Sequence, residues 1–315
     1  MHPAKSVIFF TTATGAGYGL LVALFAYSLL GEAPADNSFT WGAFFSAFFL
    51  IIAGLLSSTL HLGHPERAWR ALSQWRSSWL SREGVAALFT FIPAGLFLYS
   101  WLTFGMTSIY TFLFGALTAI LSLATVYCTA MIYVSLKAIP AWRNLWTLPV
   151  YLSFSIMTGT VLFNFLVELF TVPTSRLPLY SSVGFLLYGY LFKGFYWVFV
   201  KSAPKVATIQ SATGLKASSI RQLDAPHDSA NYLMDEMGYR IARKHARKLW
   251  PLSIFFGFVA PTTILALSLV SNLGGDVYPA GLALFYMTIG VVIERWLFFA
   301  EAKHVVTLYY GEEKV

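Results

Sequence analysis

A histidine and a glutamate mark the two ends of a polar stretch that lies between two long apolar runs. The stretch, HLGHPERAWRALSQWRSSWLSRE, contains the 23 residues from His61 to Glu83 and includes a second histidine, four arginines and three tryptophans. An imidazole exchanges protons near neutral pH, and a carboxylic acid is a natural partner for it in proton transfer. These residue types therefore indicate hydrogen bonding to a polar ligand, coupled to proton exchange.

The composition shows that the surroundings of this stretch are lipid. Hydrophobic residues make up 57% of the 315 residues and charged residues only 11%, whereas soluble domains have roughly 25% charged residues. The formal net charge of +7 lies in the connections between apolar runs, so we expect membrane lipid and not nucleic acid as a partner. Cys128 stands alone in an apolar run, which excludes an internal disulfide and a cysteine-ligated metal site.

Runs of about 20 apolar residues predict eight membrane-spanning helices. The runs lack the alternation of a barrel strand, and a helix satisfies its own backbone in lipid. The expected fold is an all-α integral membrane protein, an eight-helix bundle that forms a single transmembrane domain over residues 1–315. The predicted spans are approximately residues 6–30, 41–62, 84–104, 109–136, 148–171, 178–200, 251–272 and 278–301.

The basic residues between these spans fall almost entirely on one side of the membrane. The positive-inside rule therefore predicts that both termini and the stretch from His61 to Glu83 are cytoplasmic. Arg176 is the one basic residue expected in the opposite loops. The cytoplasmic group comprises Lys5, Arg67, Arg70, Arg76, Arg82, Lys137, Arg143, nine basic residues from Lys201 to Lys248, Lys303 and Lys314.

The longest connection, residues 201–250, is predicted to be a cytoplasmic loop with a basic amphipathic helix from about Ser229 to Trp250. Leu233, Met237 and Ile241 recur every four residues, and basic residues crowd the second half of this helix, where they complement the helix dipole. The helix either docks a cytoplasmic partner or lies on anionic lipid. The sequence leaves both interpretations open.

His61 ends the second predicted helix and Glu83 opens the third at the same membrane face, so a tight hairpin would bring the two side chains together. A quinone needs hydrogen-bond donors at its carbonyl groups and a nearby group that exchanges protons with water. We therefore predict a quinone site at His61 and Glu83, with His64, Arg67 and Arg82 beside them. The alternative is that His61 caps its helix and Glu83 pairs with neighbouring arginines as an interface anchor.

Three further charged residues, Lys193, Glu294 and Arg295, lie within predicted spans. They are candidate relay groups, although long side chains close to the inner interface also snorkel there for structural reasons. We predict no catalytic residue and no metal site, because dinucleotide, phosphate-loop, CxxC and metal-ligand motifs are missing from the sequence. A haem b would need facing histidines, for which His61 and His304 are the one conceivable pair, and we expect no haem.

The segments STLHLGHPERAWRAL (58–72) and SWLSREG (78–84), set among eight spans, resemble the membrane-anchor subunits of dimethyl sulfoxide reductases. The resemblance implies that the quinone-site histidine of the motif HLG falls on His61 and the quinone-site glutamate of the motif S-x-E on Glu83. It also implies two partners, a molybdopterin catalytic subunit and a four-cluster iron–sulfur subunit, which hold the redox cofactors. The anchor itself would not act on the substrate but would react with ubiquinone or menaquinone in the bacterial cytoplasmic membrane.

A later segment, NYLMDEMGYRIARKHARKL (231–249), is similar to anchors of the quinone-linked sulfite dehydrogenases in this family. This similarity implies electron flow from cytoplasmic sulfite oxidation to quinone, with the partner subunits on the cytoplasmic side. His64 and Glu66 around Pro65 depart from other members, so the quinone type does not carry over. Three alternatives stay open: a quinol-oxidising anchor of a dimethyl sulfoxide or related reductase, an anchor without quinone binding, and a secondary transporter.

Overall fold

The computed structural model describes residues 4–60, 62, 64–170, 175–202, 208–215, 220, 223–224, 240–270 and 277–310. Within these ranges, eight helices are long and apolar enough to cross a membrane, which confirms the predicted all-α bundle of eight spans. The first six are α1 (Lys5–Leu29), α2 (Asn37–Thr59), α3 (Trp79–Phe104), α4 (Ile109–Val134), α5 (Thr147–Phe170) and α6 (Leu177–Ser202). The seventh span, Lys248–Val270, combines the end of α9 (Arg240–Ile254), η2 (Phe255–Val259) and α10 (Ala260–Val270), and the eighth is α11 (Val277–Ala300).

Several helix ends differ from the predicted ones, and the third helix matters most. It begins at Trp79, five residues before the predicted start at residue 84, so Glu83 lies in the second turn of α3 and not in front of it. The second helix also begins early, because the Asp36 side chain caps it by accepting a hydrogen bond of 3.0 Å from the Phe39 N–H. The Asp36 cap thus extends α2 beyond its apolar run, while α3 takes in residues 79–83 without a side-chain cap.

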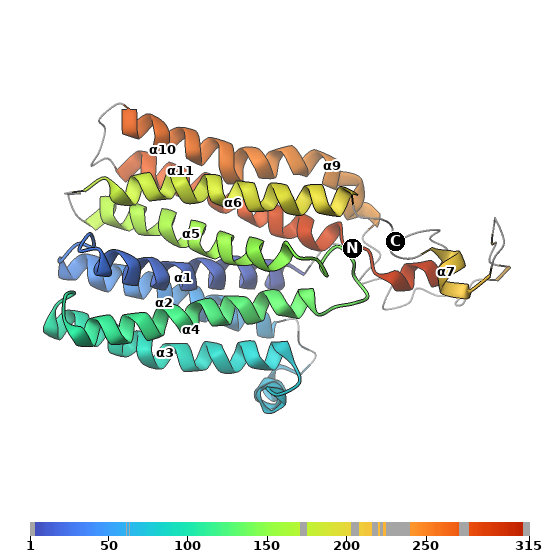
Figure 1. Ribbon diagram of the computed structural model, residues 1–315, viewed down its shortest axis with the longest axis horizontal. Helices are drawn as coiled ribbons and strands as arrows, with labels where there is room; N and C mark the ends of the chain where they lie inside the picture. Colours follow the sequence, from blue (N-terminus) through green and yellow to red (C-terminus); the bar gives the residue numbers. More distant parts are fainter. Residues whose placement is uncertain are drawn as a thin grey trace.

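The spans pack as neighbouring pairs around α1 and α5 (Figure 1). Helix α1 contacts α2, α4 and α5, while α3 packs on α4, α6 on α5, and α10 on α11. Close approach of α1 and α5 depends on glycine, because a Cβ atom on Gly19 or Gly159 would collide with the backbone of the facing helix. Small residues permit such contacts between helices in lipid, where van der Waals packing drives association. α5 is the most enclosed span of the bundle.

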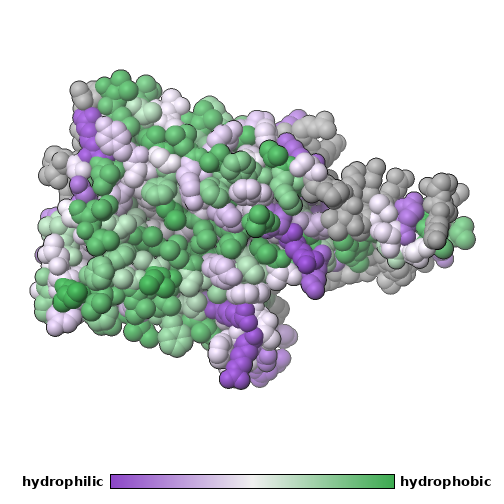
Figure 2. All heavy atoms as spheres, viewed as in Figure 1, coloured by the Kyte–Doolittle hydropathy of each residue, from purple (hydrophilic) through white to green (hydrophobic). Residues whose placement is uncertain are grey.

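The outer faces of the bundle are apolar, and charged residues gather at its ends. Figure 2 shows a largely hydrophobic flank with hydrophilic residues concentrated at the two ends of the spans and over the projecting segment beside α3. Phe45, Leu88, Ile120 and Leu187, on four different spans, are exposed, as expected for side chains that face lipid. We call the end that holds the starts of α1, α3 and α5 the basic end. It carries Lys5, Arg67, Arg70, Arg76, Arg82, Lys137, Arg143, Lys201 and Lys303.

Three short helices lie outside the spans in the described residues. The 3₁₀ helix η1 (Pro65–Gln74) links α2 to α3 and contacts α3, while η3 (Val305–Tyr310) follows α11 and α7 (Ile209–Thr213) lies in the long loop. The predicted amphipathic helix from Ser229 is described only from Arg240, where α9 runs directly into the seventh span. Residues 225–239 lie outside the described part of the protein.

Candidate functional site

Glu83 is a buried carboxyl group one turn inside the basic end, with only 3% of its surface exposed. The Thr129 hydroxyl on α4 donates a hydrogen bond to Glu83 Oε1. The same hydroxyl lies 3.1 Å from the carbonyl oxygen of Thr125. A hydroxyl has one proton to donate and can also accept one. Thr129 can therefore donate to an ionised Glu83, or accept from a protonated Glu83 while it donates to Thr125.

The pair of helices α3 and α4 builds this environment. Ala87, one turn after Glu83, is 1% exposed, and the Thr90 and Thr125 hydroxyls lie 3.4 Å apart across the same interface. The small and hydroxyl-bearing residues let the two helices approach closely, so the Glu83 side chain is enclosed. An ionisable group in such a place is costly and is by default a candidate for function.

His64 and Arg67, two of the predicted site residues, stand at the exposed start of η1. His64 Nδ1 lies 3.0 Å from Glu66 Oε1, and Arg67 Nε lies 3.7 Å from the same oxygen. More than half of each of these three side chains is exposed. In the structure both residues therefore pair with Glu66 at the surface, whereas Glu83 is buried.

Arg82, next to Glu83, forms hydrogen bonds with the turn between η1 and α3. Its Nε donates to the carbonyl oxygen of Trp75 at 2.9 Å and its Nη2 to that of Arg76 at 2.7 Å. The guanidinium also lies over the Trp79 ring, 4.2 Å from the ring centroid. Arg82 thus orders the segment that leads into α3 and fixes the start of the helix that carries Glu83.

His61 lies outside the described residues, so its predicted contact with Glu83 stays a prediction. The described neighbours agree with a hairpin, because α2 ends at Thr59 and α3 begins at Trp79 at the same end of the bundle. His304, the other histidine considered for haem, accepts a hydrogen bond at its Nδ1 from the Val306 N–H at 3.0 Å. Burial lowers the pKa of His304 below its ordinary value.

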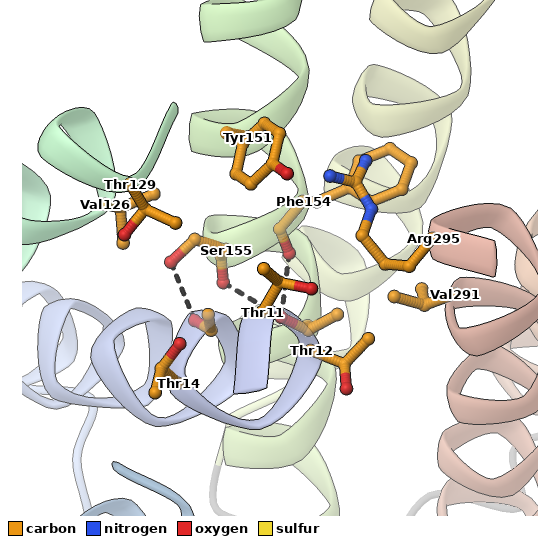
Figure 3. A pocket seen from close by; sticks show the side chains of 12 residues that line it. Thr11, Thr12, Thr14, Val126, Thr129, Tyr151, Phe154, Ser155, Val291 and Arg295 are labelled. Carbon is orange, nitrogen blue, oxygen red and sulfur yellow. Dashed lines mark hydrogen bonds between the residues drawn. The ribbon is translucent and has the colours of Figure 1, made fainter. Parts of the chain in front are cut away.

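A small central cavity lies beside Thr129, between α1, α4, α5 and α11 (Figure 3). Its volume is about 20 Å³, which is room for one water molecule. Two buried polar atoms at this cavity, the Tyr151 hydroxyl and Arg295 Nη2, have no hydrogen-bond partner among the described residues. The other polar groups around it are the hydroxyls of Thr11, Thr12, Thr14, Thr129, Ser155 and Thr158.

A buried cluster of three charged side chains borders the central cavity. Lys193 on α6 forms an ion pair with Glu294 Oε1 on α11, and Arg295 Nε lies 2.6 Å from Glu294 Oε2. None of the three is more than 3% exposed. The Lys193 ammonium lies 3.8 Å from the centroid of the Tyr196 ring and the Arg295 guanidinium 4.4 Å from that of Tyr151, so aromatic faces compensate part of the excess positive charge. Lys193 is thus paired inside the bundle and does not snorkel to the interface.

The sequence offered no signal that singles out Thr129 or Tyr151. Thr129 and Tyr151 lie in apolar runs that contain many hydroxyl residues, and only the rotation of α4 and α5 within the bundle determines which hydroxyls face Glu83 and Arg295. The pairing of Lys193 with Glu294 also depends on how α6 and α11 are placed. For that pairing, the signal in the sequence was the presence of ionisable residues within predicted spans.

Comparison with known proteins assigns the protein to a family. The family model described as DMSO reductase anchor subunit (DmsC) matches residues 1–311. The protein belongs to this family of anchor subunits. The anchor is 32% identical over 325 aligned residues to a sulfite dehydrogenase subunit of Allochromatium vinosum, a match that covers 98% of the anchor and 99% of that relative. It is also 25% identical over 259 residues to one of the polypeptides of the anaerobic dimethyl sulfoxide reductase of Escherichia coli, covering 79% of the anchor and 83% of the relative.

These comparisons confirm the resemblance that the segments around His61 and Glu83 indicated. The anchor is an integral membrane protein and a membrane-anchor subunit homologous to the Allochromatium vinosum sulfite dehydrogenase subunit. The similarity extends over almost the whole sequence, including the long loop and the last span.

Proposed function

We propose that the anchor is the quinone-reactive subunit of a molybdopterin oxidoreductase complex and passes electrons between an iron–sulfur subunit and the membrane quinone pool. The observation that carries this proposal is Glu83, a carboxyl group buried near one membrane face with a hydroxyl partner that suits both of its protonation states. Glu83 also stands in the motif S-x-E, where the resemblance to the family puts the quinone-site glutamate.

The residues around Glu83 fit the needs of a quinone. Reduction of a bound quinone takes up electrons and protons together, so its site needs a proton donor as well as hydrogen bonds to the ring carbonyls. Glu83 holds and releases the proton, Thr129 keeps its carboxyl in place, and His61 provides the second hydrogen bond. His64 and Arg67 at the surface and Arg82 at the turn remain predicted members of this site.

The complex most strongly supported by the comparisons is a sulfite dehydrogenase. The Allochromatium vinosum relative, which is named as a sulfite dehydrogenase subunit, aligns over almost the whole length of both proteins. In our proposal a molybdopterin subunit oxidises sulfite, a four-cluster iron–sulfur subunit takes up the electrons, and quinone receives them at the anchor. The partner subunits sit at the basic end, which the positive-inside rule assigns to the cytoplasm of a bacterial inner membrane.

The second candidate is the reverse reaction, with quinol oxidised at the same site to supply a reductase. The similarity to the Escherichia coli dimethyl sulfoxide reductase polypeptide favours it, although at lower identity and coverage. Membership of the anchor family favours either of these over a transporter.

Isolation of the tagged anchor from membranes in mild detergent tests the proposal. We expect two larger subunits to co-purify, with molybdenum and iron in the preparation, and sulfite to reduce a quinone analogue. Quinol-dependent reduction of dimethyl sulfoxide without sulfite oxidation would instead establish the second candidate. If the anchor is recovered alone from membranes of cells that express the whole complex, the proposal is wrong.

A further inference from the structure

The cluster of Lys193, Glu294 and Arg295 lies between two cavities. Lys193 lines a second cavity of about 500 Å³, the basic-end cavity, which is bounded by α9 and by the ends of α6 and α11. Arg295 lines the central cavity on the other side of the cluster. The two end members of the cluster therefore face different cavities, and Glu294 joins them by a contact to each.

The basic-end cavity gives the cluster access to water. Its volume far exceeds the ~30 Å³ that one water occupies in the liquid, so it can hold a chain of waters. Glu301, just after α11, is an exposed residue that lines this cavity together with the buried Lys193. Partial burial raises the pKa of the Glu301 carboxyl above its ordinary value, which favours proton exchange closer to neutral pH.

The central cavity continues the polar path towards Glu83. Arg295 Nη2 and the Tyr151 hydroxyl lack partners in the described structure and border a space for one water. Such a water would satisfy both groups, since buried polar atoms rarely stay unpaired. Thr129 borders the same cavity and is bonded to Glu83. From Glu301 to Glu83 each neighbouring pair thus shares a contact or a cavity, and Arg295 stands between Glu294 and the central cavity.

We infer that the cluster of Lys193, Glu294 and Arg295 carries protons from the basic-end cavity to Glu83. The inference rests on the proposed function, because it gives the source of the protons that a quinone at Glu83 takes up. The three buried charged residues make none of the proposed quinone contacts. The inference gives them a role in supplying protons.

Each step moves one proton and no electron. The Lys193 ammonium transfers a proton to the Glu294 carboxylate and regains one from water in the basic-end cavity. Glu294 does not line the central cavity in this structure, so the inference requires its side chain to turn past Arg295 before it releases its proton to the water there. Thr129 accepts that proton from the water as it gives its own to Glu83. Arg295 keeps its charge throughout, because a guanidinium does not deprotonate in proteins, and holds the water in place.

Two substitutions of Lys193 separate proton transfer from a structural role. Lys193→Met leaves Glu294 paired with Arg295, so the bundle should still assemble with its partners. Lys193→Arg keeps the positive charge and the ion pair but cannot release a proton. We expect both variants to slow quinone reduction in the purified complex at least tenfold, with an increased solvent deuterium isotope effect and unchanged affinity for a quinone-site inhibitor. Normal rates in Lys193→Arg would overturn the inference.

A third variant tests the proton path without changing the charged cluster. Ala246 lines the basic-end cavity and is 5% exposed, so Ala246→Phe should fill the cavity and slow quinone reduction in the same way. Leu252→Phe, at an exposed position of the same helix, is the matched control and should have no effect.

Loss of activity in Glu83→Gln together with normal rates in the Lys193 and Ala246 variants would reject the inference and leave the proposed function intact. Normal rates in Glu83→Gln would reject the proposed function itself.

Discussion

At the scale of single residues, the environment of Glu83 differs from that of the charged residues around it. Arg82 beside it donates hydrogen bonds to two backbone carbonyl groups. His64 and Arg67 pair with Glu66 at the surface. Glu83 is instead buried with one neutral hydroxyl partner on another helix. A group so placed keeps its capacity to change protonation, because no described ion pair holds it in the charged form.

Thr129→Val should therefore impair the site without unfolding the bundle. Valine has the shape of threonine but leaves the Glu83 carboxyl without its hydroxyl partner, a loss of about 1–3 kcal/mol for a buried group. We expect quinone reduction to slow by about tenfold or more, since ~1.4 kcal/mol corresponds to a factor of ten. Thr129→Ser keeps the hydroxyl and should retain most activity. Steady-state quinone reduction by the purified complex is the measurement, and equal activity of Thr129→Val and the unmodified protein would contradict the role of this contact.

At the scale of elements, the contact between α1 and α5 holds the central cavity in shape. Both helices contribute hydroxyl groups to it, and the Ser155 hydroxyl donates to the Gly15 carbonyl oxygen at 2.7 Å. The close approach that makes this bond possible depends on Gly19, which faces the Ser155 carbonyl group without a side chain. The shape of the central cavity, which Thr129 also lines, thus depends partly on Gly19.

Gly19→Ala should destabilise the anchor. Its added methyl group meets the backbone of α5, so the helices must separate, and overpacking of this kind costs about 1–3 kcal/mol. Gly95→Ala is the matched control, because no atom lies within 4 Å of a Cβ at Gly95. Thermal unfolding of the complex in detergent should show a lower midpoint for Gly19→Ala and an unchanged midpoint for Gly95→Ala. Identical midpoints in the two variants would mean that α1 and α5 are not packed as described.

At the scale of the whole molecule, the sequence predicts the bundle well because lipid imposes a simple rule on it. A span must be apolar over about 20 residues, so the eight runs and their order could be read directly. Two helices begin earlier than the approximate predicted spans, because residues 79–83 belong to α3 and residues 37–40 to α2. These first turns mix polar with apolar residues, so apolar content alone does not mark where the helix begins.

The candidate site could be predicted only in part. Glu83 was identified from its residue type and its place at a span end, and the structure shows that it is buried. Its partner Thr129 and the contact of Lys193 with Glu294 depend on helix rotation and on neighbours distant in sequence. Apolar periodicity carries little information about rotation when the helix faces either protein or lipid on every side.

The central claim is that quinone reacts at Glu83, and the most direct test is quinone reduction by the purified complex carrying Glu83→Gln. Glutamine matches the size of glutamate and can hydrogen bond to Thr129, but it cannot deliver a proton. Glu32→Gln, at the opposite end of the bundle, is the control. We expect Glu83→Gln to assemble with its partners, to accept electrons at its iron–sulfur subunit and to lose quinone reduction almost completely, while Glu32→Gln stays active. Quinone reduction at the normal rate in Glu83→Gln would contradict the account.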